Sequence, residues 1–399
     1  MTSSKYLILI ILALCTVLSC TEKDGGGAVS ISLDPLELNA PYTRSDQTFE
    51  LQSNGDWTVK VESIEGLPIA WAKVNREKGR GNANVSIRVN QNDYSDERVA
   101  KVIVTSATGE TAVLTLTQSG NPGSSAVLNE LTLRIGTYNL RVTTSKDTGE
   151  YAWVNRRTRL IKSIYDNDFD VFGVNECNKE IQSYINENLK NDYNIKYFSP
   201  YSQDGVGDNA QGLVYKKGYT LLDWNYFWLS ETPDIMVDND KSGDSVYKRG
   251  GCCATLIHND SGVKFFVMVT HGAVNKSVRD KYAYLYIEME KKYNPNAYPS
   301  FFVGDMNARP DQNSTKTYLT YWKDVYLELD ESQKSGPFCT FNGFDNSINL
   351  NNDPRRIDYV YYRNATPLNY VCNDTKYGDY FASDHLPVYS DMKILSMIE

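Results

Sequence analysis

Two of the three histidines in this chain, His271 and His385, stand at or beside the ends of apolar stretches, together with several acids and amides. An imidazole beside a carboxylate can hold or pass on a proton, and a group of oxygen donors suits a hard divalent cation. A single aspartate after a strand is usually a turn residue or a helix cap, so the set carries more weight than any member. The set is Asn139, Glu176, His271, Asp305, Asn307, Asp358, Asp384 and His385.

These side chains can form one site only if the strands that carry them end close together. Phe265–Val269 and Phe301–Val303 are uninterrupted apolar runs, which are typical of strands buried on both faces. Another segment has the three- and four-residue spacing of an amphipathic helix, with basic residues on the other side. Its spaced residues are Trp153, Arg157, Leu160, Ile161 and Ile164. Strands covered by helices predict a layered α/β domain, in which polar residues at one sheet edge line a pocket.

A different pattern precedes this domain. From residue 28 to residue 118 apolar and polar residues alternate, as in Val29-Ser30-Ile31-Ser32-Leu33, and turn signals separate the runs. Short alternating strands at this spacing predict a β-sandwich. Trp57 lies on one of these strands, which favours a core position over an exposed sugar platform. Residues 119–126 have the composition of a linker, so the larger domain is expected at residues 127–399.

The first twenty residues are typical of an export signal. Lys5 precedes the uncharged, mostly apolar run Tyr6–Leu18, which is shorter than the roughly 20 residues of a membrane span. The run leads into Leu18-Ser19-Cys20, which resembles the bacterial lipobox, so residues 1–20 are expected to be a lipoprotein signal peptide with lipidation at Cys20. An ordinary signal peptide with an incidental cysteine is the alternative. Residues 21–27 are expected to form a flexible tether.

This reading predicts a lipoprotein that sits on a membrane without spanning it. We expect it in the cell envelope of a Gram-negative bacterium, as an outer membrane lipoprotein exposed at the surface.

The composition counts against a nucleic-acid partner and against a zinc or iron–sulfur site. The formal net charge is −9 and the pI is about 5.1, whereas a protein that grips long nucleic acid usually shows a positive face. Nucleic acid is therefore a disfavoured partner, although net charge says nothing of a local groove. The seven cysteines include no CxxC pair, which counts against a zinc or iron–sulfur site. A single disulfide among the five cysteines after Cys20 is compatible with the sequence, which does not indicate which two would pair.

Six motifs in a fixed order carry a resemblance to a known family. They are Gly136-Thr137-Tyr138-Asn139, Val174-Asn175-Glu176, Thr270-His271, Gly304-Asp305-Met306-Asn307, Arg356-Ile357-Asp358-Tyr359 and Ser383-Asp384-His385. From Leu131 to Ile394 the chain resembles the endonuclease/exonuclease/phosphatase superfamily, and Phe227-Trp228-Leu229-Ser230-Glu231-Thr232-Pro233 resembles a bacterial hydrolase branch of it. The resemblance implies an α/β fold, a four-layer sandwich of the deoxyribonuclease I-like type.

The N-terminal strands resemble the BACON domain, an Ig-like β-sandwich. Ser53-Asn54-Gly55-Asp56-Trp57-Thr58-Val59, Trp71 and Thr117-Gln118 carry this resemblance. Carbohydrate binding has been proposed for that family, so a glycan contact is one interpretation of residues 28–118. A spacer between a lipid anchor and an enzyme is the interpretation that we favour.

The superfamily resemblance implies a metal site. Glu176 would be the principal ligand of Mg²⁺, or of Mn²⁺, with Asn139 and Asp384 close to the ion. Oxygen ligands suit these hard cations, and nothing in the set suits a soft metal. The usual glutamine before the metal glutamate is Asn175 here, and a shorter amide could shift the ion.

The resemblance also implies the acid–base groups. Asp358 would hold one ring nitrogen of His385, which keeps that ring protonated and facing a phosphate oxygen. His271 would be the second imidazole, donating to the phosphate or to the leaving oxygen. Asp305 would orient or deprotonate water, and Asn307 would donate a hydrogen bond to the phosphoryl group.

Two further positions concern substrate contacts. Arg249 could add a positive charge near the phosphate, but a solvated surface arginine is the interpretation that we favour. The bacterial branch often continues after the histidine as Leu-Asp-His, whereas this chain reads His271-Gly272-Ala273-Val274-Asn275. The missing acid and histidine affect the choice of substrate more than the reaction.

We therefore expect an exported phosphoric ester hydrolase, a phosphodiesterase or a phosphomonoesterase. An exported nuclease is the alternative with the same chemistry. A non-catalytic glycan-binding surface lipoprotein is the alternative of another class, and the retained carboxylates count against it because buried charges without a metal are costly. A sphingomyelinase-like lipid hydrolase would need an exposed apolar loop, and its candidate, Trp224–Trp228, matches a family motif that favours a core position.

Overall fold

The computed structural model describes residues 29–64, 69, 71–92, 94–122, 130–236 and 248–395. The predicted signal peptide with Cys20, the tether 21–27 and residues 123–126 of the predicted linker lie outside this part of the chain. Within the described ranges, no helix has both the length and the apolar character that a membrane span requires.

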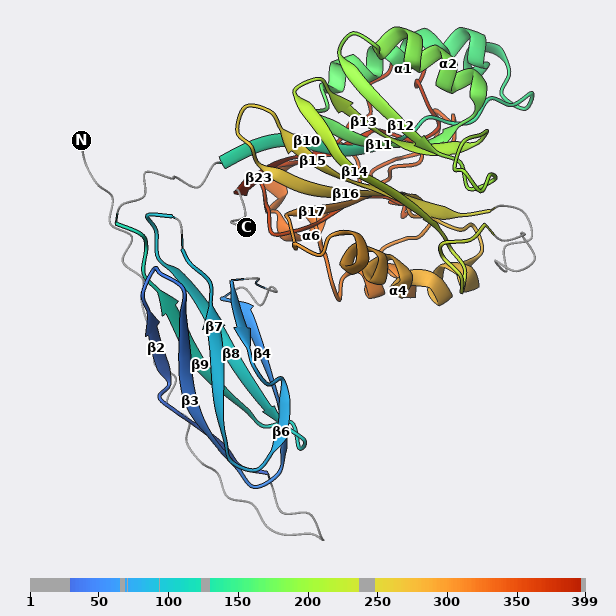
Figure 1. The fold of residues 1–399 in the computed structure, drawn as a ribbon. Helices are drawn as coiled ribbons and strands as arrows, with labels where there is room; N and C mark the ends of the chain where they lie inside the picture. Colours follow the sequence, from blue (N-terminus) through green and yellow to red (C-terminus); the bar gives the residue numbers. More distant parts are fainter. Residues whose placement is uncertain are drawn as a thin grey trace.

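Residues 31–118 form a β-sandwich of two sheets (Figure 1). One sheet has the order β1 (Ile31–Asp34), β3 (Ser45–Ser53), β7 (Ala83–Val89) and β5 (Ala72–Val74). The other has the order β2 (Glu37–Ala40), β9 (Thr111–Gln118), β8 (Arg98–Ser106), β4 (Asp56–Ser63) and β6 (Lys78–Arg80). Trp57 is 2% exposed, and its indole N–H donates to the Gly81 carbonyl over 2.7 Å. The predicted core position of Trp57 is confirmed.

Residues 130–395 contain two larger sheets. The first has the order β12 (Tyr193–Phe198), β13 (Ala210–Lys216), β11 (Val171–Cys177), β10 (Glu130–Asn139), β23 (Val388–Leu395), β22 (Tyr370–Cys372) and β19 (Lys334–Ser335), with β21 (Thr366–Pro367) beside β23. The second has the order β14 (Tyr219–Trp228), β15 (Gly250–His258), β16 (Lys264–His271), β17 (Ser300–Asp305), β20 (Asp358–Arg363) and β18 (Lys323–Asp324). The described residues of this domain form the α-helices α1 (Trp153–Asn167), α2 (Lys179–Leu189), α4 (Lys276–Tyr293), α5 (Asn313–Tyr318) and α6 (Val325–Glu328), and the 3₁₀ turns Gly149–Tyr151 and Glu331–Gln333.

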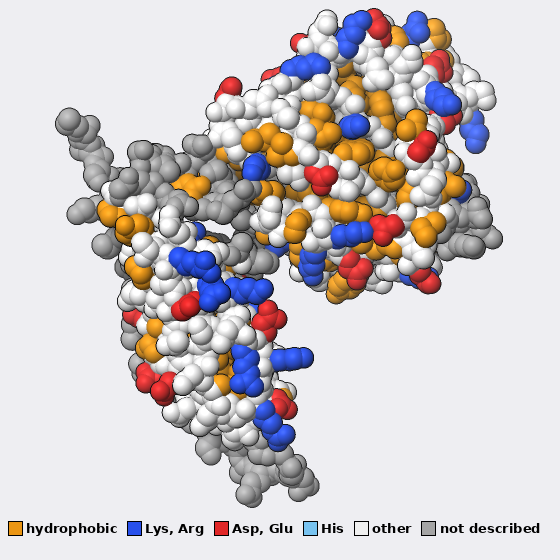
Figure 2. Space-filling view, in the orientation of Figure 1, with side chains coloured by type: hydrophobic (Ala, Val, Ile, Leu, Met, Phe, Trp, Pro, Cys, Tyr) orange, Lys and Arg blue, Asp and Glu red, His pale blue; other side chains and the backbone are white. Residues whose placement is uncertain are grey.

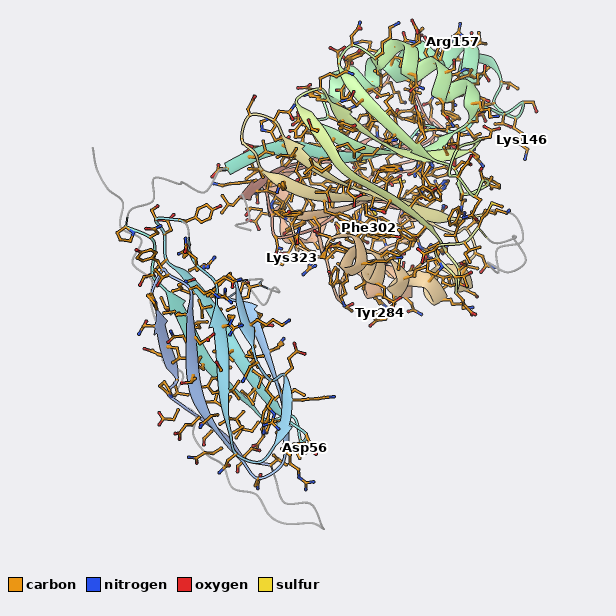
Figure 3. All side chains as sticks on the ribbon, in the orientation of Figure 1. Asp56, Lys146, Arg157, Tyr284, Phe302 and Lys323 are labelled. Carbon is orange, nitrogen blue, oxygen red and sulfur yellow. The ribbon has the colours of Figure 1, made fainter. Side chains whose placement is uncertain are left out.

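The two sheets pack face to face with helices outside them (Figure 1). Apolar residues of both sheets, among them Val171 and Val303, form one buried cluster. A second cluster, which includes Leu160 and Ile185, joins α1 and α2 to the first sheet. A third joins α4 to the second sheet and contains Phe302, which Figure 3 shows inside the domain. The predicted four-layer α/β sandwich is confirmed.

The buried face of α1 differs from the predicted one by one basic residue. Arg156 is 0% exposed, whereas Arg157 lies partly at the surface (Figure 3). The Arg156 guanidinium donates to the carbonyls of Leu140 over 2.8 Å and of Ala382 over 3.3 Å, and also to the Arg141 carbonyl. Placing Arg157 on the inner face was wrong, because carbonyls of two loops accept hydrogen bonds from both Nη atoms of Arg156 there.

The remaining predictions about the core concern a candidate loop and the thiols. Trp224–Trp228 lies inside β14, where Phe227 and Trp228 are buried and Trp224 and Tyr226 pack partly buried against the core, so this stretch is not an exposed apolar loop. The five cysteines from Cys177 to Cys372 are buried free thiols.

Candidate active site

The strand pairing brings the predicted polar residues to one edge of the two sheets. β10 and β11 are parallel, so Asn139 and Asn175 lie side by side where these strands end. β16 and β17 are also parallel, with His271 opposite Asp305. β20 runs antiparallel to β17 and begins at this edge, with Asp358 opposite Asp305. The edge therefore collects side chains from both sheets.

Asp384 and His385 enter the same place from the loop before β23. The segment 340–342 holds this loop, because Leu386 N–H donates to the Thr340 carbonyl over 2.7 Å and Asn342 N–H donates to the Asp384 carbonyl over 2.8 Å. All eight residues predicted to form the site thus lie in one neighbourhood.

Asp305 is at the centre of this group and is buried. Its Oδ2 lies 3.1 Å from Asn139 Nδ2, 3.4 Å from His271 Nε2 and 3.7 Å from His385 Nε2. Its Oδ1 accepts the backbone N–H of Asn307 over 2.8 Å. Burial by itself would raise the pKa of Asp305, but the two imidazoles and this N–H together hold that pKa below its usual value. Asp305 is therefore an ionised carboxylate.

His385 forms a charged pair with Asp358. Its Nδ1 lies 2.9 Å from Asp358 Oδ2, and the same oxygen accepts the Thr340 hydroxyl over 2.6 Å. Burial opposes the charged ring, but Asp358 and Asp305 outweigh it and raise the pKa of His385 to about 10. Burial raises the pKa of Asp358 to about 6. The ring of Phe341 packs edge-on against His385 with centroids 4.9 Å apart, which fixes the plane of the imidazole.

His271 has different surroundings. Its Nδ1 lies 3.3 Å from Nη1 of Arg249. Burial first, and then the charge of Arg249, lower the pKa of His271 below its usual value. Arg249 is 8% exposed, so the interpretation of a solvated surface arginine was wrong. It directly precedes β15, whose second residue pairs with Thr270, and this register places Arg249 beside His271.

Glu176 stands on an irregular part of β11. The register shifts between Val174 and Cys177, and Glu176 has a positive φ of 61°. Its Oε2 accepts the Val142 N–H over 2.8 Å and its Oε1 accepts Asn139 Nδ2 over 3.2 Å. Burial would raise the pKa of Glu176, but His271 and the Val142 N–H lower it below its usual value. A strained residue next to an active site is a common way to redirect a side chain.

Asp384 faces the same space as Glu176. Burial and the charge of Glu176 raise the pKa of Asp384 above its usual value, although Arg141 opposes the shift. Arg141 Nη1 lies 3.4 Å from Asp384 Oδ2, and the same guanidinium makes two hydrogen bonds with Asp147, of 2.8 and 2.9 Å. Two neighbouring carboxylates that repel each other are an arrangement that a divalent cation relieves.

Two groupings of donors could hold a metal. Ligand atoms of Asp305, Asp358 and His385 all lie within 4.8 Å of one another. In that group, however, a proton lies between His385 and Asp358, so the imidazole has no lone pair to offer on that side. Glu176 and Asp384 present carboxylate oxygens, which are the donors that Mg²⁺ prefers. Their chemistry therefore fits a hard cation better.

The three amides of the site bond to groups of the protein itself. Asn139 turns its NH₂ group toward Asp305 and Glu176, so in this arrangement it is a donor. Asn307 Nδ2 donates to the Gly272 carbonyl over 3.0 Å, which ties two loops together. Asn175 donates to the Thr270 carbonyl over 2.9 Å and accepts the Asp305 N–H over 3.0 Å. The shorter amide thus joins the two sheets beneath the site.

Sequence reasoning missed Arg141, Thr340 and Gln211. A basic residue two positions after Asn139 was a usable signal for Arg141, but no local pattern pointed to Thr340. Gln211 accepts the backbone N–H of His271 over 2.9 Å and donates to the Gly250 carbonyl over 2.9 Å. Only the pairing of distant strands shows its position.

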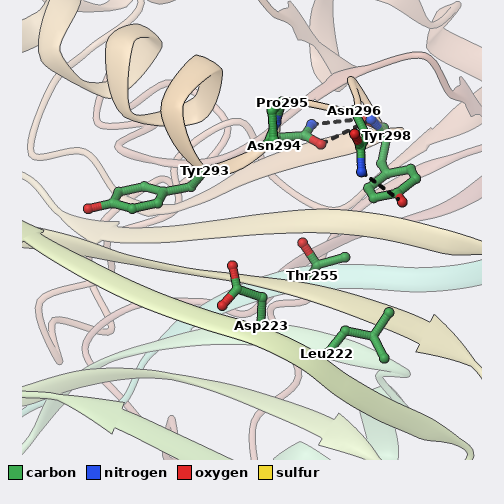
Figure 4. Close-up of a pocket in the computed structure, with 8 residues that line it drawn as sticks. All are labelled: Leu222, Asp223, Thr255, Tyr293, Asn294, Pro295, Asn296 and Tyr298. Atoms are coloured by element: carbon green, nitrogen blue, oxygen red, sulfur yellow. Dashed lines mark hydrogen bonds between the residues drawn. The ribbon is translucent and has the colours of Figure 1, made fainter. Parts of the chain in front are cut away.

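A surface hollow of about 230 Å³ lies elsewhere on the domain (Figure 4). Asp223 and Thr255, opposite each other in β14 and β15, line one side of it, and Tyr293–Asn296 and Tyr298 line the other. Residues 293–298 lead into β17 at Ser300, whereas Asp305 of the site is at the other end of this strand. This hollow contains none of the predicted site residues.

The endonuclease/exonuclease/phosphatase family matches residues 136–385, which include all eight residues of the site. The chain belongs to this family. Members of the endonuclease/exonuclease/phosphatase family are hydrolases, some of them phosphatases, and they typically use divalent metals. The BACON family matches residues 57–119, so a BACON domain precedes the family domain.

Solved structures of the family share the fold. A family protein from Bacteroides thetaiotaomicron is 24% identical with a TM-score of 0.61, and the match covers 67% of this chain and 97% of that one. A mannosyl-6-phosphatase from the same species is 25% identical with a TM-score of 0.58, over 65% of this chain and 99% of that one. An uncharacterised protein of Acanthamoeba polyphaga mimivirus is 23% identical over 248 residues, which are 60% of this chain and 91% of the viral protein.

Proposed function

We propose that this protein hydrolyses phosphate monoesters with a divalent cation, Mg²⁺ or Mn²⁺, outside the cytoplasm. The observation that carries the proposal is the charged Asp358–His385 pair, which lies next to ionised Asp305 and near Glu176 and Asp384. An imidazolium, a water-orienting carboxylate and a carboxylate metal site are the three parts that hydrolysis of a phosphate ester needs.

Glu176 and Asp384 would hold the cation. When bound, such a cation neutralises charge on the phosphoryl oxygens and lowers the pKa of a bound water. The Arg141 guanidinium beside Asp384 adds a fixed positive charge at the same rim, where a phosphate oxygen can approach it.

His385 would supply further positive charge to the phosphate. With Nδ1 held by Asp358, its Nε2–H points toward Asp305, where a phosphoryl oxygen can accept it. Asp305 has a lowered pKa and is therefore a weak base, so we expect it to orient a water rather than to take its proton.

The similarity to a mannosyl-6-phosphatase supports a sugar phosphate as the substrate class. A nuclease is the second candidate, and the charge distribution counts against it. On the face that Figure 2 shows, the Lys and Arg side chains of the larger domain lie scattered and do not form a continuous stripe. A continuous stripe is what a long polyanion requires. Release of acid-soluble nucleotides from DNA at catalytic amounts of protein would reverse this ranking.

The position in the cell envelope is also a proposal. The apolar run before Cys20 and the glycine-rich tether support a lipid anchor in the outer membrane. For the BACON domain we propose a spacer role, because Trp57 is 2% exposed and cannot stack on a sugar. Specific binding on a glycan array by residues 28–118 would contradict the spacer role.

The test is hydrolysis of p-nitrophenyl phosphate and bis(p-nitrophenyl) phosphate by the chain without residues 1–20. We expect metal-dependent turnover that EDTA removes, with the monoester preferred. Glu176→Gln and His385→Gln should each lower the rate by on the order of 10²–10⁴. The matched controls are Glu180→Gln, at an exposed position of α2, and His258→Gln, at the end of β15. Equal losses in the controls would contradict the assigned roles.

A further inference from the structure

Arg249 approaches one ring nitrogen of His271 and so restricts which form that imidazole can take. Nη1 of Arg249 lies 3.3 Å from His271 Nδ1, and both side chains are buried. A guanidinium offers only N–H donors and remains protonated in proteins. The Nδ1 atom of His271 must therefore accept, and the ring hydrogen is on Nε2.

The other side of the ring agrees with this assignment. His271 Nε2 lies 3.4 Å from Asp305 Oδ2, which is an acceptor. The opposite tautomer would set two donors against each other at Arg249 and would turn a lone pair toward a carboxylate. The backbone is held as well, because the His271 N–H donates to Gln211 Oε1 over 2.9 Å. The ring therefore meets a donor on one side and an acceptor on the other.

The second imidazole of the site lies between two carboxylates. His385 Nδ1 faces Asp358 Oδ2 at 2.9 Å, and its Nε2 lies 3.4 Å from Asn139 Nδ2 and 3.7 Å from Asp305 Oδ2. Asp358 and Asp305 raise the pKa of His385, so this ring is charged. The two rings around Asp305 differ because one has a guanidinium where the other has a carboxylate.

We propose that Arg249 is a positioning residue that holds His271 as a neutral imidazole with its hydrogen on Nε2, so that His271 acts as a fixed hydrogen-bond donor to the phosphate ester. The part that concerns the ester rests on the function proposed above, whereas the tautomer does not. Burial and Arg249 both lower the pKa of His271, which agrees with a neutral ring.

The experiment is ¹⁵N NMR of the metal-free full chain with labelled histidines. The chain has three histidines, and loss of a signal in His271→Gln identifies the relevant one. At neutral pH we expect a pyridine-type Nδ1 and a pyrrole-type Nε2 for His271. A doubly protonated ring, or hydrogen on Nδ1, would overturn the proposal.

Substitutions of Arg249 make the test specific. Arg249→Lys keeps a donor-only group and should preserve the pattern. Arg249→Met removes the donor and should shift the tautomer ratio toward Nδ1–H by about tenfold or more, since a hydrogen bond to a charged group is worth that much. An unchanged pattern in Arg249→Met would overturn the proposal.

Arg249→Leu serves if the methionine variant does not fold by circular dichroism. Leucine also removes the donor, so the ratio should move in the same direction, and a fixed ratio would again contradict the proposal. Turnover of p-nitrophenyl phosphate is measured on the same samples. The expected tautomer without turnover in the parent protein would contradict the proposed function and support the role of Arg249.

Discussion

Asp305 keeps its charge between two imidazoles that differ in their partners. His385 is charged because Asp358 holds its Nδ1, and His271 faces the guanidinium of Arg249. The lowered pKa of Asp305 follows from these neighbours and outweighs the effect of burial. A carboxylate of this kind positions a water well and removes its proton poorly. At this scale the chemistry depends on which polar atom each ring nitrogen meets.

Asp358→Asn should remove the negative charge beside His385 while keeping a side chain of nearly the same size. The pKa of His385 is raised to about 10, with Asp358 as the main cause that opposes burial. The ring of the metal-free parent should therefore remain protonated as the pH rises until about 10, and in Asp358→Asn it should lose its proton at a lower pH. NMR titration of His385 measures the shift, and turnover should fall by on the order of 10². Asp234→Asn, whose exposed carboxylate pairs with Lys292, is the control. An unchanged titration in Asp358→Asn would contradict the pairing.

α1 positions the site through one buried side chain. Arg156 reaches across to the loop after β10 and to the loop before β23, and it donates to carbonyls of both. Asn139 is the last residue before the first of these loops, and Asp384 lies in the second. The helix therefore acts as a brace for residues that come from opposite ends of the domain sequence.

Arg156→Met should lower the free energy of unfolding by on the order of 3 kcal/mol, because three buried carbonyls lose their donor. Turnover should fall with it, since the two loops lose their common contact. Urea denaturation and a rate assay measure the two effects. Arg157→Met is the matched control one position along the helix, where the guanidinium lies over the Tyr184 ring and its loss should cost about 1 kcal/mol or less. Equal effects at both positions would rule out the brace.

The two sheets approach closely at Gly173. A Cβ atom there would lie 2.8 Å from Val269 Cγ1 and 2.9 Å from Val303 Cγ2. Gly173→Ala should therefore destabilise the domain by about 1–3 kcal/mol through overpacking. Gly218→Ala is the control, because a Cβ at Gly218 has no neighbour within 4 Å. Thermal unfolding compares them, and equal stability of the two variants would show that the sheets can separate at no cost.

The described residues form four buried hydrophobic clusters. One belongs to the β-sandwich and three belong to the larger domain, and no cluster contains members of both. The family match, 136–385, lies wholly within the larger domain. Catalysis should therefore not depend on contacts with the BACON domain.

Residues 127–399 alone should fold and keep the kcat/KM of residues 21–399 for p-nitrophenyl phosphate within about threefold, because every proposed site residue lies in this part. Steady-state kinetics of the two proteins, with circular dichroism as the folding control, make the comparison. A tenfold lower value for a folded short chain would show that the N-terminal domain contributes to substrate binding.

Much of the fold and of the site could be predicted from the sequence. Alternation of period two is a local consequence of strand geometry, and uninterrupted apolar runs reflect burial on both faces. Because such runs end where the chain leaves the core, the polar residues after them, such as Asn139, His271 and Asp305, could be selected before any contact was known. The order of the motifs was sufficient to predict the family and the four layers.

The tertiary structure decided which atom each of these residues meets. Arg249 and His271 are joined by the register of β15 with β16, and Thr340 reaches Asp358 from a distant loop. Arg156, and not Arg157, is buried because carbonyls of two loops are available to it. Local spacing indicates that a residue is near a strand end or on a helix face. It does not specify the donor or acceptor opposite, because that partner belongs to another part of the chain and is set only when strands pair and layers pack.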